Sequence, residues 1–156
     1  MAPDADISAN LYGTALAVGD LGILIRGPSG SGKSDLALRA LALRAGPLVP
    51  RQPMLIADDR VLVTRRNGIL GLGCPVAIEG LIEVRGVGIV PVPFVAVAIL
   101  ALVVDLVAPD DVPRLPETGG EVEICGVQVR HIRLSPFEPS APLKLVLALE
   151  NVRASL

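Results

Sequence analysis

Apolar residues recur in short runs and alternating patterns along most of the chain, which is typical of a strand-rich domain. Leu11–Val18 and Leu21–Arg26 are two such segments, and the Gly19-Asp20 turn between them predicts a hairpin. Asn67-Gly68 predicts a second hairpin by the same reasoning. Further strands or hairpin arms are expected at 54–57, 60–64, 69–72, 81–86, 87–90, 94–107 and 121–130.

Two segments have the composition of helices. Residues 35–44 are rich in strong helix formers, and Gly46-Pro47 directly beyond them predicts the end of that helix. Pro142 suits the first turn of a second helix running to about Val152.

The length and composition predict one α/β domain with a real core. The chain has 156 residues, of which 51% are hydrophobic and 19% charged. We expect residues 1–10 to be a flexible N-terminus and residues 11–156 to form the domain. The net charge is −2 and there are three aromatic residues, so a basic surface or a stacking platform for nucleic acid is not expected.

The uncharged stretch 86–104 is the one candidate for a membrane span. Pro91 and Pro93 divide it into pieces too short to cross a bilayer as a helix, so buried strands are the better interpretation. No signal peptide is recognised at the start of the sequence, and we expect a cytoplasmic location without membrane contact. Cys74 and Cys125 lack C-x-x-C spacing and are interpreted as small core residues.

Residues 27–34 carry the strongest chemical signal. They fit G-x-x-x-x-G-K-[ST], in which glycines let backbone N–H groups approach phosphate oxygens and the following helix N-terminus attracts anions. The expected phosphate-binding residues are Gly27, Pro28, Ser29, Gly30, Ser31, Gly32, Lys33 and Ser34. Lys33 would neutralise phosphates, and the Ser34 hydroxyl would ligate Mg²⁺. The alternative is a flexible turn that binds nothing, but a preceding strand and a following helix disfavour it.

Charged residues at the ends of apolar strands are the next candidates. Asp58 and Asp59 follow the apolar run 54–57, so one carboxylate can face a metal while the other meets a substrate hydroxyl. A solvated Asp-Asp turn is the alternative. Glu83 and Arg85 share one face of an expected strand, as a magnesium ligand and a phosphate clamp or simply as a surface ion pair. His131, the one histidine, is interpreted as structural or exposed.

Three landmarks together resemble the C-terminal catalytic domain of bacterial HPr kinase/phosphorylase. They are the 27–34 loop after Tyr12-Gly13-Thr14, the Ile56–Val61 segment, and Glu83-Val84-Arg85-Gly86-Val87-Gly88-Ile89. The resemblance extends from about Leu11 to Lys144 and suggests a short, catalytic-domain-only form. It implies a β-rich P-loop fold related to phosphoenolpyruvate carboxykinase, with helices after the loop and at the C-terminus, and a hexameric tendency.

The resemblance also implies an activity and residue roles. The activity would be ATP-dependent phosphorylation of a serine on HPr or a related small phosphocarrier of the phosphotransferase system. Ser34 and Glu83 would hold Mg²⁺, the Asp58/Asp59 pair would supply the base with Asp59 slightly favoured, and Arg114 would match the family's catalytic arginine.

Two departures from the family pattern leave alternatives open. Tyr12 occupies the place of a histidine, and a tyrosine, with a reference pKa near ~10, cannot carry positive charge. A catalytically impaired ATP-binding regulator is therefore the alternative function, and a small-molecule kinase is a more distant one. Residues 135–142 replace a glycine-arginine-asparagine loop tied to the reverse reaction, so we expect phosphorolysis to be weak or absent.

Overall fold

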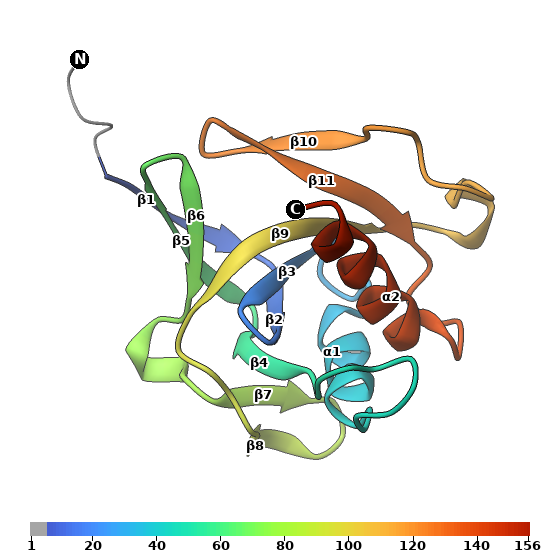
Figure 1. The fold of residues 1–156 in the computed structure, drawn as a ribbon. Coiled ribbons are helices and arrows are strands. Elements are labelled where there is room, and N and C mark those ends of the chain that lie inside the picture. The colour runs from blue at the N-terminus through green and yellow to red at the C-terminus, as the bar shows by residue number, and fades with distance from the viewer. Residues whose placement is uncertain (1–5) are drawn as a thin grey trace.

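A large curved sheet dominates the computed structural model, which describes residues 6–156 (Figure 1). Nine strands form this sheet, in the order β1–β5–β6–β9–β3–β2–β4 with β11 and then β10 attached to β9. These strands are β1 (Ile7–Tyr12), β2 (Thr14–Val18), β3 (Leu21–Arg26), β4 (Met54–Ala57), β5 (Arg60–Arg66), β6 (Ile69–Gly73), β9 (Ala98–Leu106), β10 (Glu121–Ile124) and β11 (Val127–Leu134). A separate hairpin consists of β7 (Leu81–Val84) and β8 (Gly88–Pro91).

The centre of the sheet is parallel although its margins are antiparallel. β9 pairs in parallel with β3 on one edge, and with β11 along the last part of its other edge. This arrangement brings the carboxyl ends of the three strands together, with Arg26 of β3 opposite Asp105 of β9. The 27–34 loop leaves β3 at this end, so the pairing fixes where the loop begins.

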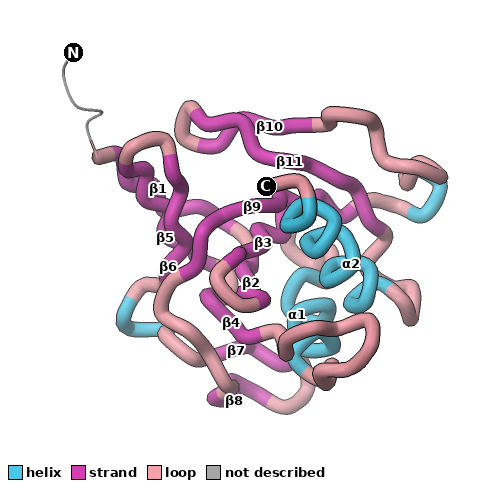
Figure 2. The backbone as a smooth tube through the Cα atoms, viewed as in Figure 1, coloured by secondary structure: helices cyan, strands magenta, loops and turns pink. Residues whose placement is uncertain are grey.

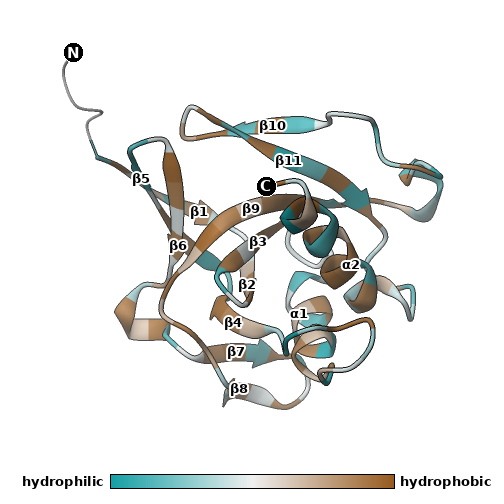
Figure 3. Cartoon of the chain, viewed as in Figure 1, coloured by the Kyte–Doolittle hydropathy of each residue, from teal (hydrophilic) through white to brown (hydrophobic). Residues whose placement is uncertain are grey.

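Both α-helices pack on the same side of the sheet and contact each other (Figure 2). α1 (Lys33–Leu41) and α2 (Ala141–Ala154) bury Leu36, Leu145 and Leu149 completely. These side chains join a cluster that includes strand residues such as Ile23 and Val104. Strand residues such as Leu24, Ile56 and Val63 build a second cluster, because the sheet curves enough to pack on itself. Figure 3 shows β9 coloured as hydrophobic along most of its length, as its central position requires.

The expected hairpins are confirmed. β2 and β3 pair around Gly19-Asp20, and β5 and β6 pair around Asn67-Gly68. Asn67 and Gly68 have φ of 52° and 72°, the left-handed pair that a tight two-residue hairpin needs. β10 and β11 form the hairpin expected over 121–130, and the 94–107 segment forms the single strand β9. Two 3-10 helices, η1 (Val76–Ile78) and η2 (Pro109–Asp111), lie in connecting loops.

Both expected helices are present with shifted bounds. α1 begins at Lys33, inside the glycine-rich segment, and ends at Leu41 before the expected Arg44. α2 extends past Val152 to Ala154, with Pro142 in its first turn. No helix among residues 6–156 is long and apolar enough to cross a bilayer.

The expectation of a flexible N-terminus is wrong for the residues that the structure describes. Residues 7–10 belong to β1, which pairs with β5 from Ile7 opposite Arg65 to Tyr12 opposite Arg60. Polar residues at 8 and 10 conceal this strand in the sequence, because β1 lies at the sheet edge and is largely exposed. Residues 1–5 lie outside the described part of the chain.

Candidate active site

A cleft of about 490 Å³ lies above the N-terminus of α1. It is lined by residues from four parts of the chain: the β1–β2 junction, the 27–34 loop with α1, the end of β4, and the β7–β8 hairpin, together with Phe137. The sequence-predicted residues that line it are Tyr12, Ser29, Gly30, Gly32, Lys33, Ser34, Asp58, Asp59, Glu83 and Arg85. The fold therefore brings together most of the predicted site from segments up to about seventy positions apart.

The 27–34 loop has the backbone shape that its glycines allow. Gly30 and Gly32 have φ of 80° and 96°, which residues with a Cβ rarely adopt. Gly32 is also the N-cap of α1, so the first N–H groups of the helix have no partner within it. Open space around the Cβ position of Gly30 leaves room for an anion to approach the backbone closely.

Lys33 is buried and folded back on its own loop. It is 6% exposed, and its Nζ donates hydrogen bonds to the carbonyl oxygens of Gly27 at 2.7 Å and Pro28 at 3.0 Å. Tyr12 completes its surroundings, since Nζ lies 3.3 Å from the phenol oxygen and 4.4 Å from the ring centroid. A hydrogen bond and a cation–π contact thus link Tyr12 to the lysine. A phosphate group entering the loop would compete for this ammonium group.

Asp58 is the organising carboxylate of the cleft. It is 6% exposed, and its Oδ1 accepts hydrogen bonds from Thr14 Oγ1 at 3.0 Å and Ser34 Oγ at 2.7 Å. Its Oδ2 accepts a hydrogen bond from the backbone N–H of Glu83 at 3.2 Å. A buried carboxylate needs such donors, because desolvation of an unpaired charge is costly. One side chain therefore connects β2, α1 and β7.

Asp59 has different surroundings although it is the adjacent residue. Its side chain is exposed at the cleft, and its backbone has φ of 73°, a left-handed conformation that aspartate tolerates better than most residues. The carbonyl oxygen of Asp59 accepts a hydrogen bond from Gly13 N at 3.2 Å. The turn therefore points successive carboxylates to different places, as expected for this pair, with one anchored and one accessible.

The β7–β8 hairpin supplies the remaining predicted charges. Glu83 and Arg85 both line the cleft with exposed side chains. Gly86 and Gly88, with φ of 84° and 122°, form the turn directly after Arg85. The glycines of this segment thus have a structural purpose, because they allow the tight reversal that holds Arg85 at the cleft edge.

The oxygen donors in the cleft fit magnesium. Ser34 Oγ and the carboxylates of Asp58 and Glu83 are hard ligands of the kind that Mg²⁺ prefers. Within residues 6–156, no three acidic, histidine or cysteine side chains converge as a metal cage. Magnesium usually keeps waters and phosphate oxygens and takes only one or two protein carboxylates, so the donor set agrees with a metal bound alongside phosphates.

Arg114 is not among the residues that line the cleft. It is exposed in the loop between η2 and β10, and its predicted catalytic role stays a prediction.

Beside the cleft, Asp105 forms a charged cluster that sequence analysis did not predict. Its Oδ1 accepts a hydrogen bond from Arg26 Nε at 2.8 Å, and its Oδ2 lies 2.8 Å from His131 Nε2. Burial alone would raise the pKa of Asp105, but the hydrogen bonds from Arg26 and His131 outweigh it and hold that pKa below its usual value. The cluster joins β3, β9 and β11 directly before the glycine loop, and His131 is structural as expected.

Thr14 and Phe137 are the other cleft residues that sequence analysis missed. Thr14 carries no motif signal of its own beyond its position next to Gly13, and its partner Asp58 is 44 positions away. Phe137 had a detectable signal, because it is one of three aromatic residues in the chain and lies in the segment that departs from the family pattern.

The geometry agrees with a comparison against known protein families. A model of the HPr Serine kinase C-terminal domain matches residues 6–151, and the chain therefore belongs to this family.

Individual relatives carry the same description. The chain is 37% identical to the HPr kinase/phosphorylase of Enterococcus faecalis over 95% of its length, and 32% identical to that of Clostridium kluyveri over 94%. It spans about half the length of these relatives, 49% and 48% respectively. The structure of the HPr(Ser) kinase/phosphatase from Coxiella burnetii superposes with a TM-score of 0.77 at 25% identity, covering 94% of this chain and 97% of the other.

Proposed function

We propose that this chain is an ATP-dependent kinase that phosphorylates a serine on HPr or a related small phosphocarrier protein of the phosphotransferase system. The observation that carries the proposal is the Asp58 cluster. It ties the Ser34 hydroxyl of the glycine loop to the β7 strand and places the accessible Asp59 in the same cleft. A phosphate cradle, a metal-ligating hydroxyl and a free carboxylate are the parts that phosphoryl transfer requires.

The glycine loop binds the phosphates of ATP in this proposal. Backbone N–H groups of the loop and of the first turn of α1 donate to phosphate oxygens. Lys33 exchanges its contacts with the Gly27 and Pro28 carbonyls for phosphate oxygens. Ser34 and Glu83 hold Mg²⁺, and Asp58 supports it from the side of Ser34. When bound, Mg²⁺ neutralises charge on the phosphates and helps to align them.

Asp59 receives the proton of the acceptor serine. As the serine oxygen bonds to the terminal phosphorus of ATP, its proton passes to the Asp59 carboxylate, and ADP leaves with the electrons of the broken P–O bond. Asp59 suits this role because it is exposed in the cleft, whereas the oxygens of Asp58 already accept three hydrogen bonds. Arg85, at the cleft edge, would hold phosphate or the incoming protein.

Transfer of labelled phosphate from ATP to a purified HPr-type carrier tests this proposal. The variant is Asp59→Asn, which preserves shape and tolerates the left-handed backbone, and Asp111→Asn on the exposed η2 helix is the matched control. Loss of a general base should reduce kcat about 100-fold or more. Transfer by Asp59→Asn within threefold of the unmodified chain would contradict the role given to Asp59.

The alternative, an impaired ATP-binding regulator, rests on Tyr12. Its phenol accepts a hydrogen bond from Lys33, which a protonated histidine at that position would not do. Binding of ATP without transfer by the unmodified chain, combined with transfer by Tyr12→His, would favour the regulator. Transfer by the unmodified chain that Asp59→Asn abolishes would exclude it.

We also propose that the reverse reaction is weak, because residues 135–142 replace the loop tied to phosphorolysis in the family. Phosphate-dependent removal of phosphate from the phosphoserine carrier at a rate comparable with the kinase reaction would contradict this. A hexameric assembly and a relation to phosphoenolpyruvate carboxykinase stay predictions, and sedimentation velocity would test the former.

A further inference from the structure

We propose that Phe137 stacks on the base of the bound nucleotide and thereby distinguishes a nucleoside triphosphate from bare polyphosphate. This inference rests on the proposed binding of ATP at the glycine loop, and it adds a recognition element for the part of ATP that does not react.

Phe137 lies directly beside the glycine loop although it comes from a distant segment. It belongs to the connection between β11 and α2, and a Cβ placed on Gly32 would lie 3.1 Å from its ring. The ring is 70% exposed and lines the cleft. Such exposure of a large apolar ring next to a phosphate-binding loop is costly in water and calls for a partner.

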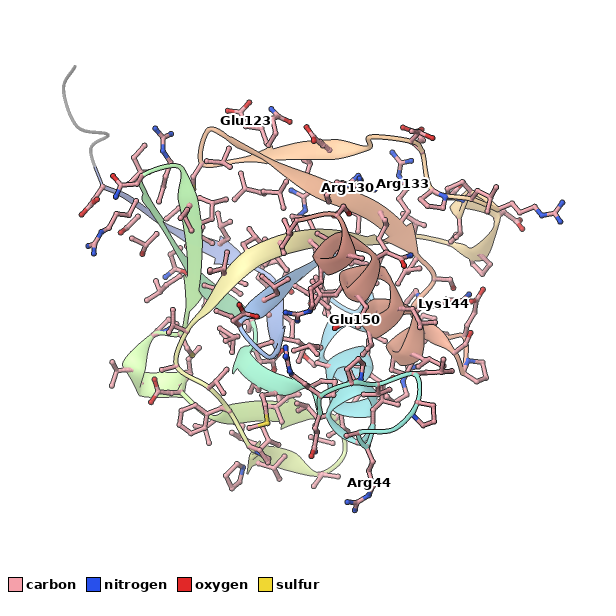
Figure 4. All side chains as sticks on the ribbon, in the orientation of Figure 1. Arg44, Glu123, Arg130, Arg133, Lys144 and Glu150 are labelled. Atoms are coloured by element: carbon pink, nitrogen blue, oxygen red, sulfur yellow. The ribbon has the colours of Figure 1, made fainter. Side chains whose placement is uncertain are left out.

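The segment that carries Phe137 is held in place on both sides. Arg39 of α1 donates hydrogen bonds to the carbonyl oxygens of Pro136 and, at 3.3 Å, of Glu138. Lys144 forms an ion pair with the Glu138 carboxylate, and Figure 4 shows Lys144 in the part of α2 nearest this segment. Pro136 itself is buried. Because both neighbours of Phe137 are fixed, binding against the ring requires little ordering of the backbone.

The position of the ring suits the base rather than the reacting phosphate. Asp58 contacts Thr14, Ser34 and Glu83, so the reacting end lies toward β2 and β7. Phe137 enters the cleft from the segment before α2, and α1 contacts both β7 and α2 (Figure 1). A triphosphate laid across the N-terminus of α1, with its terminal phosphate toward Asp58 and Asp59, directs its nucleoside toward Phe137.

The chemistry of the cleft lining leads to the same partner. Tyr12 and Phe137 are its two aromatic residues, and Lys33 Nζ already lies over the ring of Tyr12. Phe137 therefore offers the available aromatic face, and every nucleobase has a π-face that stacks on such a ring. An exposed aromatic ring would also suit contact with a carrier protein, and binding measured without any carrier separates the two.

Calorimetric titrations of the full chain, with MgATP and with inorganic tripolyphosphate plus Mg²⁺, test the proposal. Phe137→Ala should weaken ATP binding about tenfold and leave tripolyphosphate binding unchanged, because stacking is lost while the phosphate cradle remains. Leu115→Ala is the matched control, since Leu115 is 76% exposed and lies outside the cleft lining. An unchanged ATP affinity, or an equal loss for tripolyphosphate, would overturn the proposal.

A second variant gives a direct spectroscopic signal. The chain has no tryptophan, so Phe137→Trp places a single indole at the proposed stacking position. ATP should quench its fluorescence and bind within about threefold of the unmodified chain, whereas tripolyphosphate should leave the fluorescence unchanged. ATP binding without quenching would refute stacking at this position. If ATP binding depends on Phe137 but no phosphate reaches the carrier, the stacking role stands and the kinase proposal fails.

Discussion

Replacing Thr14 with valine should destabilise the chain by about 1.5–3 kcal/mol, the range for hydrogen bonds to charged groups. Thr14 is fully buried, and its hydroxyl donates to Asp58, which is itself 6% exposed. Valine keeps the branched shape and removes the donor, so a buried carboxylate oxygen retains Ser34 as its donor but loses one of the two hydrogen bonds to that oxygen. Little cavity energy enters the result, because the volume barely changes.

Urea unfolding followed by far-UV circular dichroism measures this loss, since the chain has no tryptophan and one tyrosine. The midpoint should fall without a change in slope. In a thermal melt, a chain of this size should lose roughly 3–10 °C. Thr64→Val is the matched control, because Thr64 is a half-buried threonine of β5, and its effect should stay within about 0.5 kcal/mol.

A loss below about 0.5 kcal/mol for Thr14→Val would refute the reasoning. It would mean that Asp58 obtains compensating hydrogen bonds from water, and that the Asp58 cluster is not the buried anchor described above.

Two further predictions concern groups with shifted pKa values. The lowered pKa of Asp105 contributes stability that is present above its unfolded pKa, near ~3.9, and is lost as pH falls through the folded pKa. The stability difference between the unmodified chain and Asp105→Asn, measured by urea unfolding from pH 7 to pH 2.5, should therefore shrink below about pH 4, and a constant difference would contradict it. Burial raises the pKa of the Cys74 thiol, so Ellman's reagent at pH 8 should modify Cys125, the half-buried cysteine, faster than Cys74. Single Cys→Ser variants assign each rate, and a faster reaction at Cys74 would show that its strand opens readily.

Local signals predicted much of the fold because they act over a few residues. Asn67-Gly68 specifies its turn through backbone conformations that neighbouring residues do not alter, and Pro142 marks a helix start in the same way. β1 was not predicted because an edge strand pairs on one side only and tolerates polar residues on its exposed positions. Its existence depends on pairing with β5, about fifty positions later in the chain.

The candidate site was predicted where a motif carries its own chemistry, and missed where chemistry depends on long-range pairing. The glycine loop and the Asp58/Asp59 pair could be recognised from residue type and spacing. The link from Arg26 to Asp105 could not, because it requires that β3 and β9 be parallel neighbours in one particular register. The contact of Phe137 with Gly32 similarly requires α2 to pack beside α1.

The folded-back position of Lys33 affects how an inactive variant of this chain must be designed. The ammonium group satisfies two loop carbonyls and lies against Tyr12, so removing it injures the empty protein as well as the reaction. A lysine-to-alanine variant would leave two acceptors in need of new partners at the point where the loop turns. Inactivity of that variant would not separate misfolding of the loop from loss of phosphate neutralisation, whereas Asp59→Asn leaves these contacts intact.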